Sequence, residues 1–399
     1  MRIAIISTTA VAVPPRAYGG TELITAELAK MLTRRGHDVT VYATGDSTPD
    51  ANLRFRFPTP VWPPDATAEL RHAAFAWGDI KAQPPGQKFD VVHAHQMPSL
   101  AFATMQDLPT VLTIHHVRDE VLLDYYLDFP DIAYIGISSR QAELLPELAI
   151  TRVIHHGLDP DEYNPGLGDG GYAAFLGRLA PEKGAHTAID AARLANVKLR
   201  VGGAAHWVNA GYFDAEIQPR LDASLEEVEW LGELSHAPKV ELLRGAVATL
   251  FPIEWEEPFG LVMVESMLVG TPVITFARGS TAEIVDDGVT GFVVRDRFEM
   301  ATRLRQVGSL DRGACRRRAV ERWSSMRMAR EYEEVYREVA QNREARSVPN
   351  GRTFLAHARH TPRPSPGLES ASPKTLAVPE VESSSGLFSP LWKARLKDV

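Results

Sequence analysis

The chain has 399 residues, a length that suggests two domains. Hydrophobic residues make up 44% and charged residues 24%, which is close to soluble globular proteins and excludes a fibrous or wholly disordered chain. The 43 Lys and Arg residues against 51 Asp and Glu give a net charge of −8, so no overall positive field attracts nucleic acid and an anionic ligand needs a local site. The single cysteine, Cys315, can form no internal disulfide, which fits a reducing compartment.

The amino terminus combines features of a secretory signal and of a buried strand. The apolar stretch from Ile3 to Val13 superficially resembles a short signal, but three consecutive hydroxyl residues, Ser7 to Thr9, interrupt it. We therefore predict a first strand over 2–7. Because no apolar run reaches the roughly 18 residues that a membrane span needs, we expect a soluble, cytoplasmic protein.

Short apolar runs then alternate with amphipathic stretches. Gly19–Arg35 predicts a helix, because apolar residues recur near helical spacing and Gly36 ends the pattern. Further strands are predicted at 38–43, 89–93, 110–115, 132–137 and 151–155, with helical stretches between them. This alternation predicts an α/β domain over residues 1–156, built on a parallel sheet with right-handed crossovers.

A linker is predicted over 157–171, where Gly, Pro, Asp and Asn are frequent. Gly166, Gly168 and Gly171 match the dinucleotide-binding fingerprint by letter. That motif works only after a strand and at the start of a helix, whereas here it precedes a strand. We therefore interpret these glycines as part of a flexible linker.

A second α/β series follows, with strands predicted at 172–177, 197–202, 228–231, 246–251, 272–276 and 291–294. It defines a domain over 172–342, whose last helices we expect to pack back across both domains. Two doubly wound domains joined by one hinge leave a cleft between the carboxyl edges of their sheets, where ligands bind. Residues 343–399 are rich in Pro, Ser, Thr and Gly and predict a disordered tail, with 387–397 as a candidate docking segment.

Two basic residues, Arg178 and Lys183, follow the first strand of the second domain in the segment FLGRLAPEKG, with Pro181 at the start of a predicted helix. Two cations beside helix amides can bind a diphosphate. An isolated Arg–Lys pair in a loop is more often a solvated surface.

The segment EEPFGLVMVESMLVGTPVI carries two carboxylates around a predicted helix. Glu257 precedes the first turn, and Gly260 lacks a side chain, so its amide can approach a ligand closely. Glu265 lies about two turns along an otherwise apolar helix, where an unpaired carboxylate is costly. Its partner is either a ligand hydroxyl or a buried cation.

These segments together resemble retaining GT-B glycosyltransferases of the family 4 type, also called glycosyl transferases group 1. GRLAPEKG, EPFGLVMVE and GTPVI occur in the family's order, with the two glutamates at its spacing. Gly19-Gly20-Thr21-Glu22 resembles its first-domain glycine loop, and the segment ending in His115 resembles its histidine motif. VIHHGLDPDEY and EIVDDGVTGFVV resemble its interdomain and late segments. The resemblance covers nearly all of residues 1–340.

The resemblance implies roles for residues of the second domain. Arg178 and Lys183 would hold the diphosphate of a nucleotide-sugar donor, and Glu257 would contact the sugar hydroxyls. Glu265 would accept hydrogen bonds from the ribose hydroxyls. Backbone amides of the helix start would lie near the sugar, at Phe259, Gly260 and Leu261.

In the first domain, Gly19 and Gly20 would let the chain approach the phosphates, and His115 would lie near the reacting face of the donor sugar. The resemblance implies transfer to an acceptor hydroxyl with retained configuration, the leaving phosphate helping to take the acceptor's proton. We find no first-domain carboxylate that clearly serves as the second group of a double displacement. A nucleotide-sugar epimerase of the same fold and a non-catalytic sugar-nucleotide-binding protein remain alternatives.

Several features leave questions open. Histidines fall at strand ends (His93, His95, His115, His116, His155 and His156), where a zinc site is conceivable, although the resemblance implies no metal and no other cofactor. Lys30, Arg34 and Arg35 form either a solvated helix face or a peripheral contact with anionic lipid. Residues 156–159 and 279–283 depart from the family's usual pattern. The donor base and sugar, the acceptor (saccharide, lipid or small metabolite) and the oligomeric state are undetermined.

Overall fold

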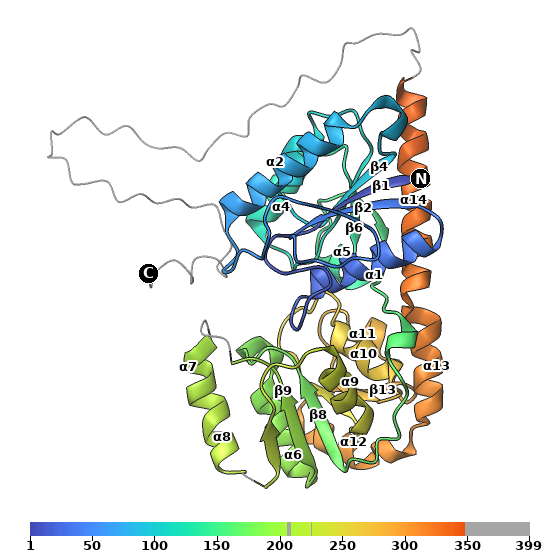
Figure 1. The fold of residues 1–399 in the computed structure, drawn as a ribbon. Coiled ribbons are helices and arrows are strands. Elements are labelled where there is room, and N and C mark those ends of the chain that lie inside the picture. The colour runs from blue at the N-terminus through green and yellow to red at the C-terminus, as the bar shows by residue number, and fades with distance from the viewer. Residues whose placement is uncertain (206–208, 225, 348–399) are drawn as a thin grey trace, which may run out of the picture.

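The computed structural model describes residues 1–205, 209–224 and 226–347, the last five by their backbone alone. It contains two parallel sheets, one in each half of the chain, flanked by helices and facing each other across the middle of the molecule (Figure 1). The predicted doubly wound architecture is therefore confirmed. The candidate docking segment at 387–397 and the tail from 348 onward lie outside the described residues.

The first sheet has seven strands in the order β3-β2-β1-β4-β5-β6-β7. The strands are β1 (Arg2–Ile6), β2 (Asp38–Ala43), β3 (Asn52–Phe55), β4 (Val91–Ala94), β5 (Thr110–Thr113), β6 (Ala133–Gly136) and β7 (Ile150–Val153). The predicted first strand is thus a central strand of the sheet, and its residues from Ile3 to Ile6 are fully buried.

The second sheet has six strands in the order β10-β9-β8-β11-β12-β13. They are β8 (Tyr172–Leu176), β9 (Lys198–Gly202), β10 (Val228–Trp230), β11 (Thr249–Phe251), β12 (Val273–Phe276) and β13 (Gly291–Val294). In each sheet the strand order reverses once, between β1 and β4 and between β8 and β11. Such a reversal opens a crevice at the carboxyl ends of the strands, the usual ligand position in doubly wound folds.

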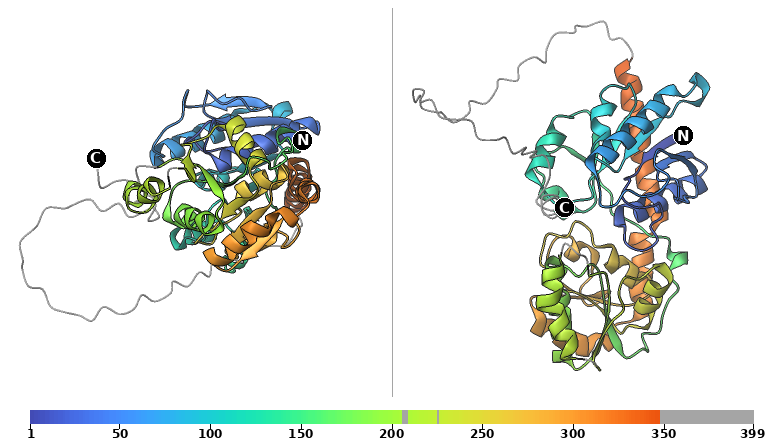
Figure 2. Two further views of the ribbon diagram at one scale, coloured as in Figure 1. Left: turned by 90° about the horizontal axis from the view of Figure 1, so that it is seen from below. Right: turned by 60° about the vertical axis from the view of Figure 1, so that its left-hand side comes forward.

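Helices cover both faces of each sheet (Figure 2). Those of the first domain are α1 (Gly20–Arg34), α2 (Ala66–Ala82), α3 (Ser99–Ala103), α4 (Glu120–Leu127) and α5 (Ser139–Glu143). Those of the second are α6 (Ala185–Ala195), α7 (Ala210–Tyr212), α8 (Gln218–Asp222), α9 (His236–Gly245), α10 (Leu261–Leu268), α11 (Thr281–Ile284) and α12 (Arg297–Gln306).

The linker is hydrogen-bonded to the second domain along its length, which differs from the predicted flexible segment. The amides of Gly166, Gly168 and Gly170 donate to the carbonyls of Val269, Arg244 and Gly245. A Cβ at Gly166 would lie 2.3 Å from the Arg244 carbonyl oxygen. The glycines therefore allow the linker to pack against the second domain, and they form no dinucleotide loop because β8 follows them.

The last two helices join the domains, as predicted. Helix α13 (Arg312–Trp323) packs on α10 of the second domain, and α14 (Ser325–Ser347) packs on α1 of the first. Leu158 of the linker forms an isolated bridge with Ser324 between the two helices. Helix α14 extends beyond the predicted domain end at 342.

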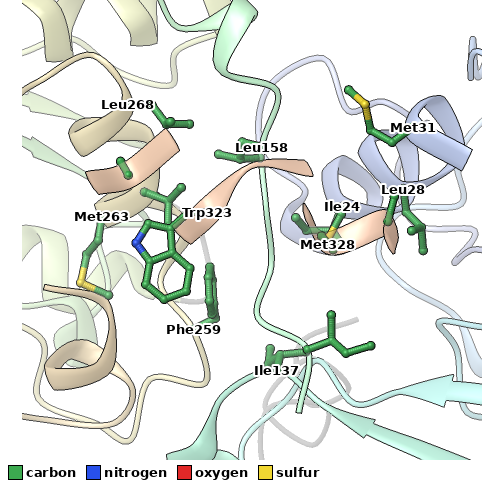
Figure 3. Packing of buried hydrophobic residues seen from close by; sticks show 14 of the residues in the cluster. Ile24, Leu28, Met31, Ile137, Leu158, Phe259, Met263, Leu268, Trp323 and Met328 are labelled. Atoms are coloured by element: carbon green, nitrogen blue, oxygen red, sulfur yellow. The ribbon is translucent and has the colours of Figure 1, made fainter. Parts of the chain in front are cut away.

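One hydrophobic core runs through the junction between the domains. Figure 3 shows Leu158 between Trp323 and Phe259 on the second-domain side and Ile24 and Met328 on the first-domain side. Because these side chains are buried together, the chain crossings at the linker and between α13 and α14 are packed as one unit.

For Lys30, both predictions made for the basic residues of α1, a solvated helix face and a contact with anionic lipid, are wrong. Lys30 is only 8% exposed, and its ammonium lies 2.9 Å from Asp159 Oδ2, with Glu162 as a further partner. Arg34 also pairs with Asp159, at 3.1 Å, and Arg35 pairs with Glu333 of α14. These cations fasten α1 to the linker and to α14. No described helix combines the length and apolar character needed to cross a bilayer.

Candidate nucleotide-sugar site

Two of the predicted donor residues of the second domain lie beside the reversal of strand order in its sheet. Arg178 follows β8 and Glu257 follows β11, the two strands that flank the reversal of strand order. Between them, Gly184 has φ +72° and its backbone lies against the next loop, since a Cβ there would be 2.1 Å from the Pro252 carbonyl oxygen. Glycine at 184 therefore lets the loop with Arg178 and Lys183 pack directly on the loop that leads to Glu257.

Lys183 and Glu257, predicted for different parts of the donor, form one cluster. Lys183 Nζ lies 2.5 Å from Glu257 Oε2 and 4.6 Å from the centre of the Trp255 ring. The Trp255 indole N–H donates to the same Glu257 oxygen at 2.8 Å. Glu257 is 8% exposed, so the cluster is largely shielded from water and holds both charged ends in fixed positions.

Arg178 faces the first domain. Its guanidinium carbon is 5.9 Å from the centre of the Tyr18 ring, which belongs to the loop before α1. Nη2 donates to Glu182 at 3.1 Å, whereas the buried Nε has no hydrogen-bond partner among the described residues. A buried guanidinium N–H without a partner is unusual, and an anion would satisfy it.

The glycine loop of the first domain meets the helix start of the second. Gly20 is the first residue of α1, and a Cβ added there would lie 3.5 Å from Leu261 Cδ1. Gly19, with φ +153°, and Gly260, with φ +80°, adopt backbone conformations that favour glycine. The predicted residues Gly19, Gly20, Gly260 and Leu261 are thus brought together, and Phe259, next to Gly260 in the chain, is 2% exposed.

Glu265 has a protein partner. Its side chain is 3% exposed and forms an ion pair with Lys239 of α9, and Tyr163 of the linker donates a hydrogen bond to Oε1 at 3.2 Å. The alternative of a buried ion pair is therefore present in this structure. Nothing in the spacing EPFGLVMVE pointed to Lys239 or Tyr163, because both come from distant parts of the chain.

His115 lies at the junction of the two domains. Its ring stacks on His156 at 5.3 Å, and His156 packs edge-on against Phe259 at 4.9 Å. His115 Nε2 is 2.8 Å from His95 Nδ1. Burial, together with neighbouring histidines, holds the pKa of the His115 imidazole well below its usual range, so the ring is neutral near pH 7.

Residues of the segment 279–283, which departs from the family pattern, support the Glu257 loop. A Cβ at Gly279 would lie 2.3 Å from the Glu257 amide nitrogen, and Ser280 Oγ donates to the Phe259 carbonyl at 2.7 Å. Glu283 reaches the first domain, where it accepts from the Ser139 and Arg140 amides at 2.8 and 2.7 Å. Glu283 thus links the domains, a role that no local sequence pattern indicated.

The other histidines have separate partners. His93 lies between Tyr336 and Thr113, His116 between Val117 and Tyr126, and His155 Nε2 is 2.9 Å from Glu283 Oε2. Within the described residues, no group of three or more His, Cys, Asp or Glu side chains is placed to hold a metal ion.

Two family models match this chain. The model of the family described as Glycosyltransferase Family 4 matches residues 18–162, and the model described as Glycosyl transferases group 1 matches residues 165–314. A glycogen synthase of Mycobacterium tuberculosis is 30% identical over 263 residues, which are 58% of this chain and 62% of that relative. The chain thus spans less than two thirds of the length of this relative.

Two further proteins cover more of the molecule. A D-inositol 3-phosphate glycosyltransferase of Mycolicibacterium smegmatis is 27% identical over 356 residues, 73% of this chain and 80% of the relative. The structure of Anabaena HepE in complex with UDP and glucose shares the fold at a TM-score of 0.67 and 20% identity, covering 84% of this chain and 99% of that one. With one family model on each domain and this fold, the chain belongs to the group 1 glycosyltransferases of the GT-B class.

Proposed function

We propose that the protein transfers a sugar from a nucleoside diphosphate to an acceptor hydroxyl and retains the anomeric configuration. The observation that carries the proposal is the convergence of Arg178, Lys183 and Glu257 at the crevice of the second sheet, opposite Gly20 of the first domain. The likeness to HepE, whose structure contains UDP and glucose, supports a nucleotide sugar as the donor.

The chemistry that we propose uses fixed positive charge. Breaking the bond between the anomeric carbon and phosphate leaves an oxocarbenium-like sugar and a diphosphate that gains negative charge. Lys183 and Arg178, held by Glu257 and Glu182, would stabilise that charge more strongly in the transition state than in the ground state. The unpartnered Nε of Arg178 supplies a donor for a phosphate oxygen.

The remaining contacts divide between sugar, ribose and acceptor. Glu257 would accept hydrogen bonds from the sugar hydroxyls. Glu265 would accept hydrogen bonds from the ribose hydroxyls, which would take the place of the hydrogen bond that Tyr163 donates in this structure. The acceptor would approach from the first domain, where His115 lies. In a same-face displacement the leaving phosphate oxygen takes the acceptor's proton, so this step requires no protein carboxylate.

Product analysis tests the proposal. Purified protein incubated with a panel of nucleoside diphosphate sugars and candidate acceptors should release nucleoside diphosphate and form a glycoside whose anomeric configuration matches the donor. An inverted product would contradict the retaining mechanism. Rearranged sugar without an acceptor would indicate an epimerase, and tight donor binding with no turnover would indicate a binding protein.

The donor can be found first by thermal shift. A ligand that binds only the folded state increases the free energy of unfolding, by about 2.7 kcal/mol when its concentration is 100 times its Kd, and so raises the melting temperature. Among the nucleoside diphosphates of uracil, guanine and adenine and their sugars, the true donor should therefore give the largest rise in melting temperature.

A further inference from the structure

Four histidine rings form a continuous chain of ring contacts between helix α14 and the Gly260 loop. Ring centres are 4.2 Å apart for His93 and His95, 5.1 Å for His95 and His115, and 5.3 Å for His115 and His156. Phe259 ends this histidine chain, 4.9 Å from His156. The histidine chain therefore connects the first-domain sheet with the second-domain loop that follows Glu257.

Within this histidine chain, two imidazoles share a hydrogen bond. His95 Nδ1 lies 2.8 Å from His115 Nε2. Burial holds the pKa of both rings well below the usual range, and neighbouring histidines add to the effect, so both are neutral near pH 7. Two neutral imidazoles can share only one proton in such a bond, so the bond fixes the tautomers of both rings together.

The environment of His95 selects one of the two arrangements. His95 Nε2 is buried and has no hydrogen-bond partner among the described residues. If His95 carried its proton on Nε2, the structure would contain a buried N–H without an acceptor, which is rarer than an unsatisfied acceptor. The proton of His95 is therefore on Nδ1 and is donated to His115 Nε2, which leaves the proton of His115 on Nδ1.

We propose that His95 is the positioning residue that holds His115 in the Nδ1-protonated tautomer, so that this nitrogen donates a hydrogen bond to the bound sugar nucleotide. No hydrogen bond within the described residues uses His115 Nδ1, and His115 is partly exposed, so this nitrogen is available for that contact. The assignment of a ligand contact to His115 rests on the proposed function, whereas the tautomer follows from the protein alone.

The position of His95 is in turn restrained by its packing against His93. His93, on which it stacks, has both ring nitrogens bonded: Nδ1 is 2.7 Å from the Tyr336 hydroxyl and Nε2 is 2.8 Å from Thr113 Oγ1. Thr113 Oγ1 is also 2.7 Å from the Tyr332 hydroxyl. Helix α14 thus fixes the plane against which His95 packs, which limits how far the ring can turn.

Nitrogen NMR of histidine-labelled protein without any ligand tests the tautomer. We expect the His115 signals, assigned by their loss in His115→Asn, to show a protonated Nδ1 and a bare Nε2. A protonated Nε2 in the wild-type protein would overturn the proposal. This measurement does not depend on activity, so it decides the proposal even if the protein transfers no sugar, an outcome that would refute only the proposed function.

Kinetics of three His95 variants test the consequence. The amide of Asn can occupy the place of Nδ1 and donate to His115, whereas an ionised Asp has nearly the same shape but only accepts, and Leu does neither. We expect His95→Asn to keep kcat within about tenfold and His95→Asp and His95→Leu to lose roughly 10–100-fold, as for partners that orient metal-bound histidines. Equal kcat in all three folded variants would contradict the proposal, because packing alone would then account for His95.

Discussion

The ammonium of Lys183 is bonded to the carboxylate of Glu257, with 2.5 Å between Nζ and Oε2. The two residues come from loops that follow neighbouring strands, β8 and β11, 74 positions apart in the chain. Each therefore positions the other before any ligand arrives. Electrostatic stabilisation is most effective when charged groups are fixed in advance, because little reorganisation is then needed during the reaction.

Lys183→Ala should lower turnover by at least about 100-fold while the fold survives. Glu257 keeps its hydrogen bond from the Trp255 indole at 2.8 Å, so the loop remains anchored without the lysine. Initial rates with saturating donor, together with a melting curve, measure both effects. Lys198→Ala is the matched control, because Lys198 is exposed on β9. Turnover like the wild type in the folded Lys183 variant would remove Lys183 from its proposed role.

Glu265→Gln should weaken binding of the nucleoside diphosphate by about 10–100-fold, the value of a hydrogen bond to a charged group. Calorimetric titration measures the affinity directly. Because Glu265 is paired with Lys239, the variant also leaves a cation without its partner. Lys239→Met is therefore the control. If it weakens binding as much as Glu265→Gln, the carboxylate acts by holding the helix and not by contacting the ribose.

Gly20→Ala should reduce catalytic efficiency with the donor without reducing the stability of the fold. A methyl group at this first helical position would make an ordinary contact of 3.5 Å with Leu261, and Ala stabilises a helix relative to Gly by up to about 1 kcal/mol. In the proposed site, the same methyl would lie between the first domain and the phosphates of the donor. We expect an unchanged or higher melting temperature and at least about a tenfold loss of kcat/KM, since small displacements can cost ~10²-fold.

Gly78→Ala provides the comparison for that variant. Gly78 lies inside α2, and a Cβ there meets nothing within 4 Å. It should therefore raise stability and leave kcat/KM unchanged. Equal kinetics for Gly20→Ala and Gly78→Ala would contradict the close approach of Gly20 to the donor.

The sequence predicted the parallel sheets because buried strands are continuous apolar runs, as at Ile3–Ile6. It did not indicate β3 (Asn52–Phe55), an edge strand whose side chains are mostly exposed and include Arg54, so that neither periodicity nor burial marks it. Local patterns reveal a strand only where they reflect a buried face.

In the candidate site, too, local sequence patterns predicted some residues and not others. Arg178, Lys183 and Glu257 could be predicted because each lies in a compact motif after a strand. The partners that hold the site could not: Tyr18 near Arg178, Lys239 on Glu265 and Glu283 on the Arg140 amide are contacts between distant segments. Such partners are set by how helices pack within the second domain, as for Lys239, or by how the two domains pack together, as for Tyr18 and Glu283, and no short sequence window contains either.

Chelation should leave activity unchanged. In the proposed mechanism Arg178 and Lys183 supply the positive charge that a divalent ion would otherwise provide for the diphosphate. Assays with EDTA, and with added Mg²⁺ or Zn²⁺ after its removal, measure the effect. A reproducible loss with EDTA that Zn²⁺ restores would support a metal site at the histidines instead.

The pH dependence of stability should depend on Glu69, on α2. Burial raises its pKa to about 7, although the amide and hydroxyl of Thr9 both donate to Oε1, and Oε2 is buried without a partner among the described residues. The folded state therefore binds a proton more tightly than the unfolded chain. The stability that this proton contributes is fully present below the unfolded pKa and is lost as the pH rises through about 7.

Glu69→Gln removes this titration, because Gln stays neutral and still accepts from Thr9. The difference in unfolding free energy, variant minus wild type, should rise by on the order of 3 kcal/mol between pH 4 and pH 8, at about 1.4 kcal/mol per pKa unit. Urea unfolding at both pH values measures it. A constant difference for Glu69→Gln would mean that Glu69 titrates alike in the folded and unfolded chain.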